Sequence, residues 1–391
     1  MINESSLNSK NDSKNSINLV INAGSIFKGG AEQVVLSFIH ECKKWSENEY
    51  HILLRDNIKS QLNTSDFPSN FIFYDVEQRP GSGLVRYMKE MRRFNRLENK
   101  IRPDCVISTG GHGYWRSSAP LVVGFNIPHF IYPESPYFKR LSIFRRIFWE
   151  MKKKIHFYFY GRSDAMVVQT DDVNKRLKSR FPKIPIYTVS NTVNSCFRNP
   201  EFFPEKLPKN KEGEIRLLTL SSWYAHKNIG VIRNLIEIYK KKGINHIKFV
   251  LTLPKDIFER EFPANYRDMI YNIGPVPINE CPSLYKECDF MFLPTLLECF
   301  SASYAEAMMM EKPILTSDLG FAHTVCGEAA QYFDPVDPED IFLKIDELVH
   351  DPEKQEKLIQ TGKERLNQFN TSTERASEFI SICKKLASSG R

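Results

Sequence analysis

Short apolar runs alternate along this chain with longer stretches in which apolar residues recur every three or four positions. The short runs have the length of buried β-strands, and the longer stretches have the period of amphipathic helices. In the first half, the predicted strands are residues 17–24, 49–55, 70–76, 105–110, 120–126, 164–170 and 186–191. The predicted helices there include residues 30–42, 86–97 and 144–160. This alternation predicts an α/β fold whose parallel sheet is covered on both faces.

A polar segment rich in Pro, Lys and Glu, residues 199–214, then interrupts the pattern and has the composition of a linker. A second alternating series follows, with predicted strands at 215–221, 248–253, 290–295, 313–317 and 331–333 and closing helices at 338–350, 352–369 and 372–387. We therefore predict a disordered tail over residues 1–16, a first domain over 17–198, a linker over 199–214, a second domain over 215–371 and a terminal segment over 372–391. Two doubly wound sheets imply a ligand cleft at their carboxyl ends.

Composition places few limits on function. The 391 residues are 41% hydrophobic and 26% charged, which is ordinary for globular domains, and the net charge of +7 suggests an anionic partner without naming one. The eight cysteines form no C-x-x-C pair, so we expect reduced thiols in a cytoplasmic protein. We expect no signal peptide, because the first sixteen residues have no apolar stretch, and no membrane span, because apolar runs are too short.

The sharpest local feature is the segment PTLLECFSASYAEAM, residues 294–308. A predicted strand ends at its start, and a helix begins near Ser301 after a loop that carries Glu298. The free N–H groups and the dipole of a first helical turn suit a diphosphate, and small residues such as Ala302 let it approach. Glu306, one turn into the helix, can accept hydrogen bonds from vicinal ribose hydroxyls. A capping serine on a solvated acidic helix is the alternative interpretation.

Two further features precede this segment in the second half. Lys227 stands where a predicted strand turns into a helix, so its ammonium could meet a diphosphate as a point charge. The segment NIGPV, residues 272–276, contains a Gly-Pro turn that could pack against a flat base. Each is weak alone, since a lone Lys at a helix start is usually a surface residue.

The order of these motifs resembles family 4 of the retaining glycosyltransferases, which have the GT-B fold. The motifs that carry the resemblance are HKN (226–228), GPV (274–276), the two glutamates of E-x7-E, KPILTSD (312–318) and AAQYFDP (329–335). In the first half they are GGAE (29–32), VVQT (167–170) and VSNTVN (189–194). The resemblance spans residues 17 to 385, and its strength lies in the ordered set.

The resemblance implies a metal-independent transfer of a sugar from a UDP- or GDP-linked donor, which is a co-substrate, with no other cofactor. Glu306 would bind the donor ribose, Glu298 would contact the donor sugar, and Lys227 would neutralise the leaving diphosphate. The other donor contacts it implies are the backbone of Phe300, Ser301 and Ala302, Val276 at the base, and Gly29 and Gly30 in the first loop. The last helix would brace the first domain.

One position departs from the family pattern. Family members usually place an Arg a few residues before the Lys, and here that stretch is Ser221–Ser222. Ser222 therefore stands in the expected donor site without the usual positive charge. Either another basic residue replaces it or stabilisation of the leaving group is weaker.

The loops after two strands of the first half could bind the acceptor. One loop holds His112, and the next holds His129 and Glu134. A histidine there could orient the acceptor or take its proton, and we select His129 as the catalytic candidate. A loop histidine without a chemical role is equally compatible with the sequence.

Residues 138–162 interleave aromatic residues with Lys and Arg. A segment of this kind can lie on an anionic membrane, which would suit a lipid-linked acceptor on the inner face of the plasma membrane. An ordinary helix with one core face and one solvated basic face is the alternative. No nucleic-acid recognition motif accompanies the basic residues.

Three functions are compatible with these observations. The leading hypothesis is a retaining glycosyltransferase that acts on a glycan or lipid-linked saccharide in surface polysaccharide biosynthesis. The alternatives are a sugar-nucleotide epimerase with the same fold and a non-catalytic subunit that binds nucleotide sugars or a membrane surface. Transfer, isomerisation or unproductive binding of the donor would distinguish them.

Overall fold

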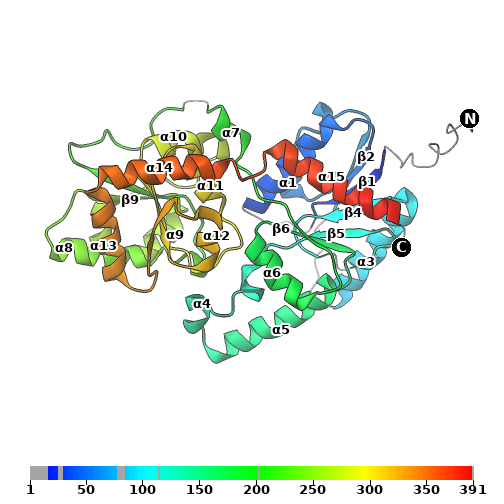
Figure 1. The fold of residues 1–391 in the computed structure, drawn as a ribbon, viewed down its shortest axis with the longest axis horizontal. Helices are drawn as coiled ribbons and strands as arrows, with labels where there is room; N and C mark the ends of the chain where they lie inside the picture. The colour runs from blue at the N-terminus through cyan, green and yellow to red at the C-terminus, as the bar shows by residue number, and fades with distance from the viewer. Residues whose placement is uncertain (1–15, 25–29, 77–83, 113–114, 201–202, 390–391) are drawn as a thin grey trace, which may run out of the picture.

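The computed structural model describes residues 16–24, 30–76, 84–112, 115–200 and 203–389. Two α/β units lie beside each other along the long axis of the molecule (Figure 1). Each contains one sheet in which every neighbouring pair of strands is parallel. The predicted tail, apart from Ser16, lies outside the described residues.

The first unit has a seven-stranded sheet in the order β3-β2-β1-β4-β5-β6-β7. Its strands are β1 (Asn18–Asn22), β2 (Glu49–Leu54), β3 (Phe71–Asp75), β4 (Cys105–Ser108), β5 (Leu121–Gly124), β6 (Ala165–Val168) and β7 (Ile186–Thr188). The inner strands β4 and β6 are buried at every position, because helices cover both faces of the sheet.

The second unit has a six-stranded sheet in the order β10-β9-β8-β11-β12-β13. Its strands are β8 (Ile215–Thr219), β9 (Ile247–Leu251), β10 (Ile270–Asn272), β11 (Phe290–Leu293), β12 (Ile314–Ser317) and β13 (Ala330–Phe333). The predicted α/β class with two doubly wound parallel sheets is confirmed. The sequence analysis missed β10, whose three residues at the sheet edge are too few to show a period.

Helices connect the strands on both faces. Those of the first unit are α1 (Gly30–Glu41), α2 (Asp56–Lys59), α3 (Leu84–Ile101), α4 (Pro136–Lys139), α5 (Ile143–Tyr160), α6 (Asp171–Arg180) and α7 (Ser195–Arg198). Those of the second are α8 (Val231–Lys241), α9 (Lys255–Glu261), α10 (Cys281–Lys286), α11 (Ala302–Met309), α12 (Gly320–Cys326), α13 (Pro338–Val349) and α14 (Pro352–Leu366). The sequence analysis placed only the start of α8, near Lys227, and it did not name α2, α4, α6, α7, α9, α10 and α12.

The segment 199–214 follows the surface of the second unit. Leu207 is 6% exposed, and its backbone N–H donates to the Glu287 carboxylate at 2.7 Å. The Phe203 N–H also donates to the Ser283 hydroxyl at 3.0 Å, and Arg216 donates to the Pro208 carbonyl at 2.6 Å. These contacts hold a segment whose polar composition alone indicates a free linker.

The last helix, α15 (Ser372–Ser389), returns to the first unit and packs against α1 and β4 (Figure 1). The Phe38 and Phe379 rings lie 5.4 Å apart at this contact. Asn370, just before the helix, donates its backbone N–H to the Ser190 hydroxyl at 2.7 Å. The chain thus crosses between the units twice, and the two crossings touch.

Strand order reverses at one place in each sheet. The switch falls between β1 and β4 in the first unit and between β8 and β11 in the second. Helices leave such a pair of strands toward opposite faces, so their carboxyl ends border an open crevice. We therefore expect a ligand site among the loops that follow these four strands.

Candidate functional site

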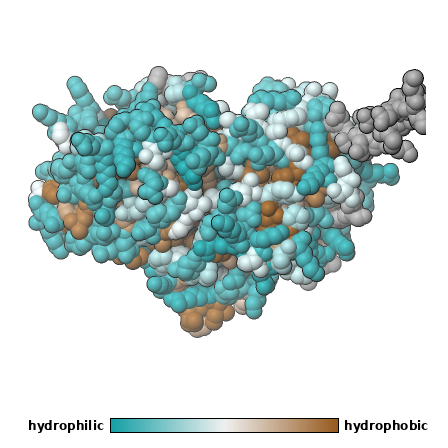
Figure 2. Space-filling view, viewed as in Figure 1, coloured by the Kyte–Doolittle hydropathy of each residue, from teal (hydrophilic) through white to brown (hydrophobic). Residues whose placement is uncertain are grey.

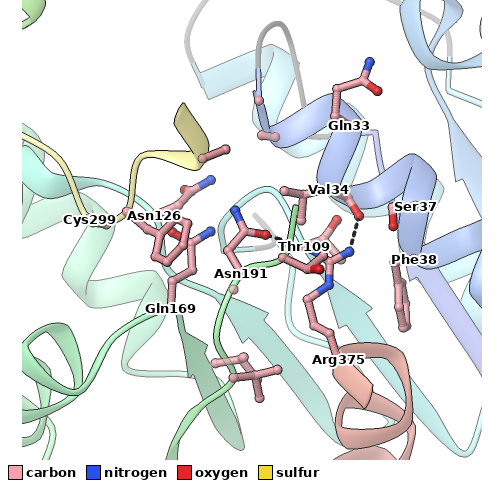
Figure 3. A pocket seen from close by; sticks show the side chains of 18 of the residues that line it. Gln33, Val34, Ser37, Phe38, Thr109, Asn126, Gln169, Asn191, Cys299 and Arg375 are labelled. Atoms are coloured by element: carbon pink, nitrogen blue, oxygen red, sulfur yellow. Dashed lines mark hydrogen bonds between the residues drawn. The ribbon is translucent and has the colours of Figure 1, made fainter. Parts of the chain in front are cut away.

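A cavity of about 280 Å³ lies between the carboxyl ends of the two sheets. Its walls come from the start of α1, the segments around the carboxyl ends of β4 to β7, residues 298–306 and α15 (Figure 3). Both halves of the chain therefore contribute, as expected for a ligand site at the switch points of two doubly wound sheets.

The second unit contributes the loop after β11 and the start of α11. Ser301 precedes the helix at the N-cap position and makes no side-chain bond to the first turn. Phe300 and Ala302 on either side line the cavity. The first-turn N–H groups of a helix have no intrahelical acceptor, so this end of α11 presents positive potential to a ligand in the cavity.

Lys227 and Glu298 form an ion pair in this wall, with side chains 17% and 12% exposed. Lys227 follows β8 and Glu298 follows β11, so the pair joins the two loops of the switch point. The loops are further joined where the Leu296 N–H donates to the His226 carbonyl at 2.7 Å. Glu298 lines the cavity, and the pair fixes the position of the lysine ammonium beside it.

Glu306 lies deeper in the same wall and is only 6% exposed. Burial raises the pKa of this carboxyl to about 7, because the charged form loses its hydration. The Tyr285 hydroxyl donates to its Oε2 at 3.3 Å and partly offsets that effect. A buried carboxyl that lines a cavity is suited to accept hydrogen bonds from ligand hydroxyls.

The wall from the first unit combines apolar side chains with uncharged hydrogen-bonding groups. Thr109, Asn126, Gln169 and Asn191 follow β4, β5, β6 and β7 in that order and line the cavity (Figure 3). Sequence analysis quoted Gln169 and Asn191 within motifs but gave them no role. Their shared position just after a strand is the signal that could have identified them.

Arg375 reaches this wall from α15 and is 3% exposed (Figure 3). Its guanidinium donates to the Asn191 Oδ1 at 2.9 Å and to the Val34 carbonyl at 2.8 Å. Burial lowers the pKa of this side chain to about 10, so it remains charged at neutral pH. The arginine joins α1, α15 and the segment after β7 at the edge of the cavity.

The structure brings five of the sequence-predicted site residues into the cavity wall, namely Gly30, Glu298, Phe300, Ala302 and Glu306. Ser301 and Lys227 adjoin it through the contacts above. Ser222 is exposed and Val276 is half-buried, and neither lines the cavity. Gly29 lies outside the described residues. The roles assigned to these side chains stay predictions.

His129 lies next to the cavity rather than in its wall. Its ring stacks on Trp149 of α5 with centroids 4.1 Å apart, and its edge faces His226 of the second unit at 5.3 Å. Burial, the neighbouring His226 and Lys152 lower the pKa of His129 to about 3. The imidazole is therefore neutral and a weak base at neutral pH, which favours positioning over proton transfer.

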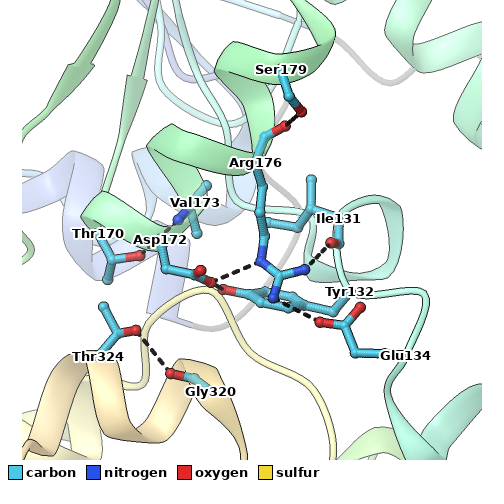
Figure 4. A network of polar contacts seen from close by, with 10 residues as sticks. All are labelled: Ile131, Tyr132, Glu134, Thr170, Asp172, Val173, Arg176, Ser179, Gly320 and Thr324. Carbon is cyan, nitrogen blue, oxygen red and sulfur yellow. Dashed lines mark hydrogen bonds and ion pairs between the residues drawn. The ribbon is translucent and has the colours of Figure 1, made fainter.

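The other two acceptor candidates lie away from the cavity wall. His112 is buried beneath α5, where its Nε2 lies 2.8 Å from Nδ1 of His156. Glu134 forms an ion pair with Arg176 at 2.7 Å (Figure 4). Arg176 also donates to Asp172 at 3.0 Å, so this network holds the loop after β5 against α6. Both contacts are structural, and an acceptor role for either residue stays a prediction.

The described part of the chain holds no group of three or more His, Cys, Asp or Glu side chains placed to bind a metal ion. All eight cysteines are free thiols, seven of them buried. Burial raises the pKa of the Cys196 thiol, the half-buried one, to about 11.

Comparisons with known proteins agree with this geometry. Residues 203–365 match the family model described as Glycosyl transferases group 1. A comparison with curated proteins found no significant match.

Several solved structures share the fold over nearly the whole chain. Sucrose-phosphate synthase from Thermosynechococcus elongatus has a TM-score of 0.70 at 12% identity, with 95% of this chain and 100% of that chain covered. Anabaena HepE, in complex with UDP and glucose, has a TM-score of 0.66 at 11% identity, with 94% and 100% covered. WaaG, a glycosyltransferase involved in lipopolysaccharide biosynthesis, has a TM-score of 0.66 at 12% identity, with 93% and 99% covered.

At these identities the neighbours establish the fold alone, and the family model matches less than half of the chain. The chain has the GT-B fold, and the match of residues 203–365 to the glycosyl transferases group 1 model supports a glycosyltransferase.

Proposed function

We propose that this protein is a retaining, metal-independent glycosyltransferase that moves a sugar from a nucleotide-diphosphate sugar to a glycan or lipid-linked saccharide. The observation that carries the proposal is the cavity wall formed by Glu298, Glu306 and the start of α11, with Lys227 held beside it by its ion pair with Glu298. These groups match the parts of such a donor in charge and hydrogen bonding.

The donor diphosphate takes the N-terminal end of α11, where free amides and the Lys227 ammonium meet its charge. The ribose hydroxyls donate to Glu306, and Glu298 contacts the donor sugar while it orients Lys227. HepE was crystallised with UDP and glucose, which supports a nucleotide-sugar ligand for this fold. Ser222 supplies no cation, so Lys227 carries most of the charge stabilisation on this side.

The chemistry we propose requires little proton transfer by side chains. The bond between the sugar C1 and the diphosphate oxygen breaks, and the acceptor oxygen forms the new C1–O bond on the same face. The acceptor proton passes to the departing phosphate oxygen. The protein contributes positioning and stabilisation of the leaving charge. A neutral His129 with a pKa of about 3 is compatible with this chemistry, because no strong base is needed.

The acceptor side faces Thr109, Asn126, Gln169 and Asn191, whose amides and hydroxyl suit saccharide hydroxyl groups. WaaG, which shares this fold, acts in lipopolysaccharide biosynthesis. We therefore place the acceptor among the saccharides of surface polysaccharide assembly in the cytoplasm.

The first experiment is a thermal-shift series with UDP, GDP, ADP, CMP and their sugar conjugates, with and without EDTA. Stabilisation by one diphosphate that survives EDTA is the expected result, because a ligand bound only by the folded state raises its stability. The selected donor is then incubated with saccharide and lipid-linked acceptors. Glycosylated product supports transfer, an isomerised donor would assign an epimerase, and binding without turnover would assign a non-catalytic subunit.

The Glu298→Ala variant tests the proposed contact of Glu298 with the donor sugar. It should still fold, with a lower melting temperature because Lys227 loses its ion-pair partner, and lose most transfer activity. A folded Glu298→Ala protein with full activity would refute the donor-sugar role.

A further inference from the structure

Helix α5 (Ile143–Tyr160) carries a row of exposed apolar side chains on the outside of the first unit. Seven of the eleven large apolar residues that are exposed in the described part of the chain lie on this one helix. They are Ile143, Phe144, Ile147, Phe148, Met151, Ile155 and Tyr158, which we call the outer stripe. Their spacing of three and four residues places them on one side of the helix.

The outer stripe is not needed to hold α5 in place. The opposite side of the helix packs on the first unit, where Trp149 stacks on His129 and Phe157 lies 5.8 Å from the Phe130 ring. Phe144 is 81% exposed and Phe148 is 60% exposed. Figure 2 shows an apolar patch at the lowest point of the molecule, over the start of α5. A concentrated apolar surface of this kind marks an interaction site.

Basic side chains border the outer stripe. The helix carries one carboxylate, Glu150, and five cations, namely Arg145, Arg146, Lys152, Lys153 and Lys154. By helical geometry, Arg145 lies along one edge of the stripe and Lys154 along the other, whereas the Lys152 ammonium lies over the Trp149 ring on the packed side. Cations that border an apolar row complement a surface with negative headgroups above an apolar interior.

We propose that α5 docks this protein on an anionic lipid bilayer, with the outer stripe inserted among the acyl chains and the bordering cations at the headgroups. The helix lies in the plane of the surface, and no described helix is long and apolar enough to cross a membrane. A second copy of the chain fits less well, because two α5 helices that share their stripes would bring their cations together.

Docking through α5 also places the cleft near the lipid surface. The segment that leads into α5 contributes Asn126 and Pro128 to the cavity wall. It contacts the second unit as well, where the Ser135 hydroxyl donates to the Leu296 carbonyl at 2.6 Å and Arg140 donates to Asn228 at 2.6 Å. A docked α5 therefore holds the site at a constant distance from the membrane.

Vesicle flotation of the full chain tests the proposal and requires neither donor nor acceptor, so its outcome is independent of the proposed function. Vesicles of phosphatidylcholine alone are compared with vesicles that contain about 30 mol% phosphatidylglycerol. We expect the wild type to float with the anionic vesicles only. Failure to bind them would overturn the proposal.

Two double variants separate insertion from charge attraction. Phe144→Ser/Phe148→Ser should weaken binding more than tenfold, on the order expected for two aromatic side chains removed from the acyl region. Arg145→Gln/Lys154→Gln should weaken it about fivefold per charge and reduce its dependence on salt. All four side chains are exposed, so the melting temperatures should not change.

Matched controls lie on the second unit. Leu343→Ser removes an apolar side chain that is 59% exposed on α13, and Lys255→Gln removes an exposed cation on α9. Both should bind vesicles like the wild type. Equal losses in the α5 variants and these controls would show attraction by overall charge and overturn the proposal. A wild-type dimer that Phe144→Ser/Phe148→Ser converts to a monomer would assign the stripe to a second copy instead.

Discussion

Replacing Glu306 by Gln should change how the stability of this protein depends on pH. The carboxyl is buried in the cavity wall, and burial raises its pKa in the folded state from about 4.5 to about 7. The folded protein therefore binds this proton more tightly than the unfolded chain does. The stability it contributes is complete below about pH 4.5 and is lost as the pH rises through about 7.

The size of this loss of stability follows from the difference between the folded and unfolded pKa values. A difference of about 2.5 pH units, at about 1.4 kcal/mol per unit, amounts to roughly 3 kcal/mol of unfolding free energy lost between pH 4.5 and 8. Gln has the same shape and does not titrate, and its amide oxygen can still accept the Tyr285 hydrogen bond. Glu306→Gln should therefore lack this loss and be the more stable protein at pH 8.

Urea unfolding of both proteins at a series of pH values measures the effect, because other titrating groups cancel in the difference between them. A difference infrared spectrum of the two proteins reports the protonation of the carboxyl directly. Parallel stability curves from about pH 5 to 8 would refute the reasoning, since they would mean that burial does not raise this pKa.

Three other substitutions test separate parts of the structure. Lys227→Met should lower kcat about 100- to 1,000-fold in a steady-state transfer assay, because one strong electrostatic contact to the leaving group is lost. A near-normal kcat would contradict the role of Lys227 in stabilising the leaving diphosphate. Gly124→Ala places a Cβ 2.8 Å from the Thr109 carbonyl oxygen, so urea unfolding should show a loss of about 1–3 kcal/mol in the free energy of unfolding. An unchanged free energy of unfolding would mean that β4 and β5 move apart without cost. Burial and Lys227 lower the pKa of His226 to about 4, so the wild type loses stability as the pH falls below about 6.5. His226→Gln should reduce that loss by up to about 2 kcal/mol at pH 5. An unchanged dependence of unfolding free energy on pH in this range would exclude the His226 contribution.

The sequence was informative wherever a local pattern has one structural solution. Alternating apolar runs and amphipathic stretches require parallel strands covered by helices, and both sheets were predicted on that basis. The carboxyl ends of parallel strands meet at one edge, so Glu298 and Glu306 could be assigned to a cleft from their place after a strand. Predicting their position on the cavity wall requires only the order of the strands and the geometry of the helix.

The sequence did not predict the roles of residues whose contacts lie far away along the chain. Arg375 is far from Asn191 and Val34 in the sequence, and only the return of α15 to the first unit joins them. The loop position of His129 predicts an accessible base, whereas its stacking on Trp149 and its burial beside His226 keep it neutral.

The sequence by itself determined the two-sheet architecture, the order of its motifs and the end of each sheet where the cavity lies, because hydrophobic periodicity and chain direction are local properties. Only the tertiary structure decided which polar side chains share the cavity, which carboxyl has its pKa raised, and which side of α5 faces solvent. Burial and proximity depend on the packing of segments that are remote in the chain, so the same 18 residues of α5 were compatible with a covered helix until the first unit was seen to contact one side alone.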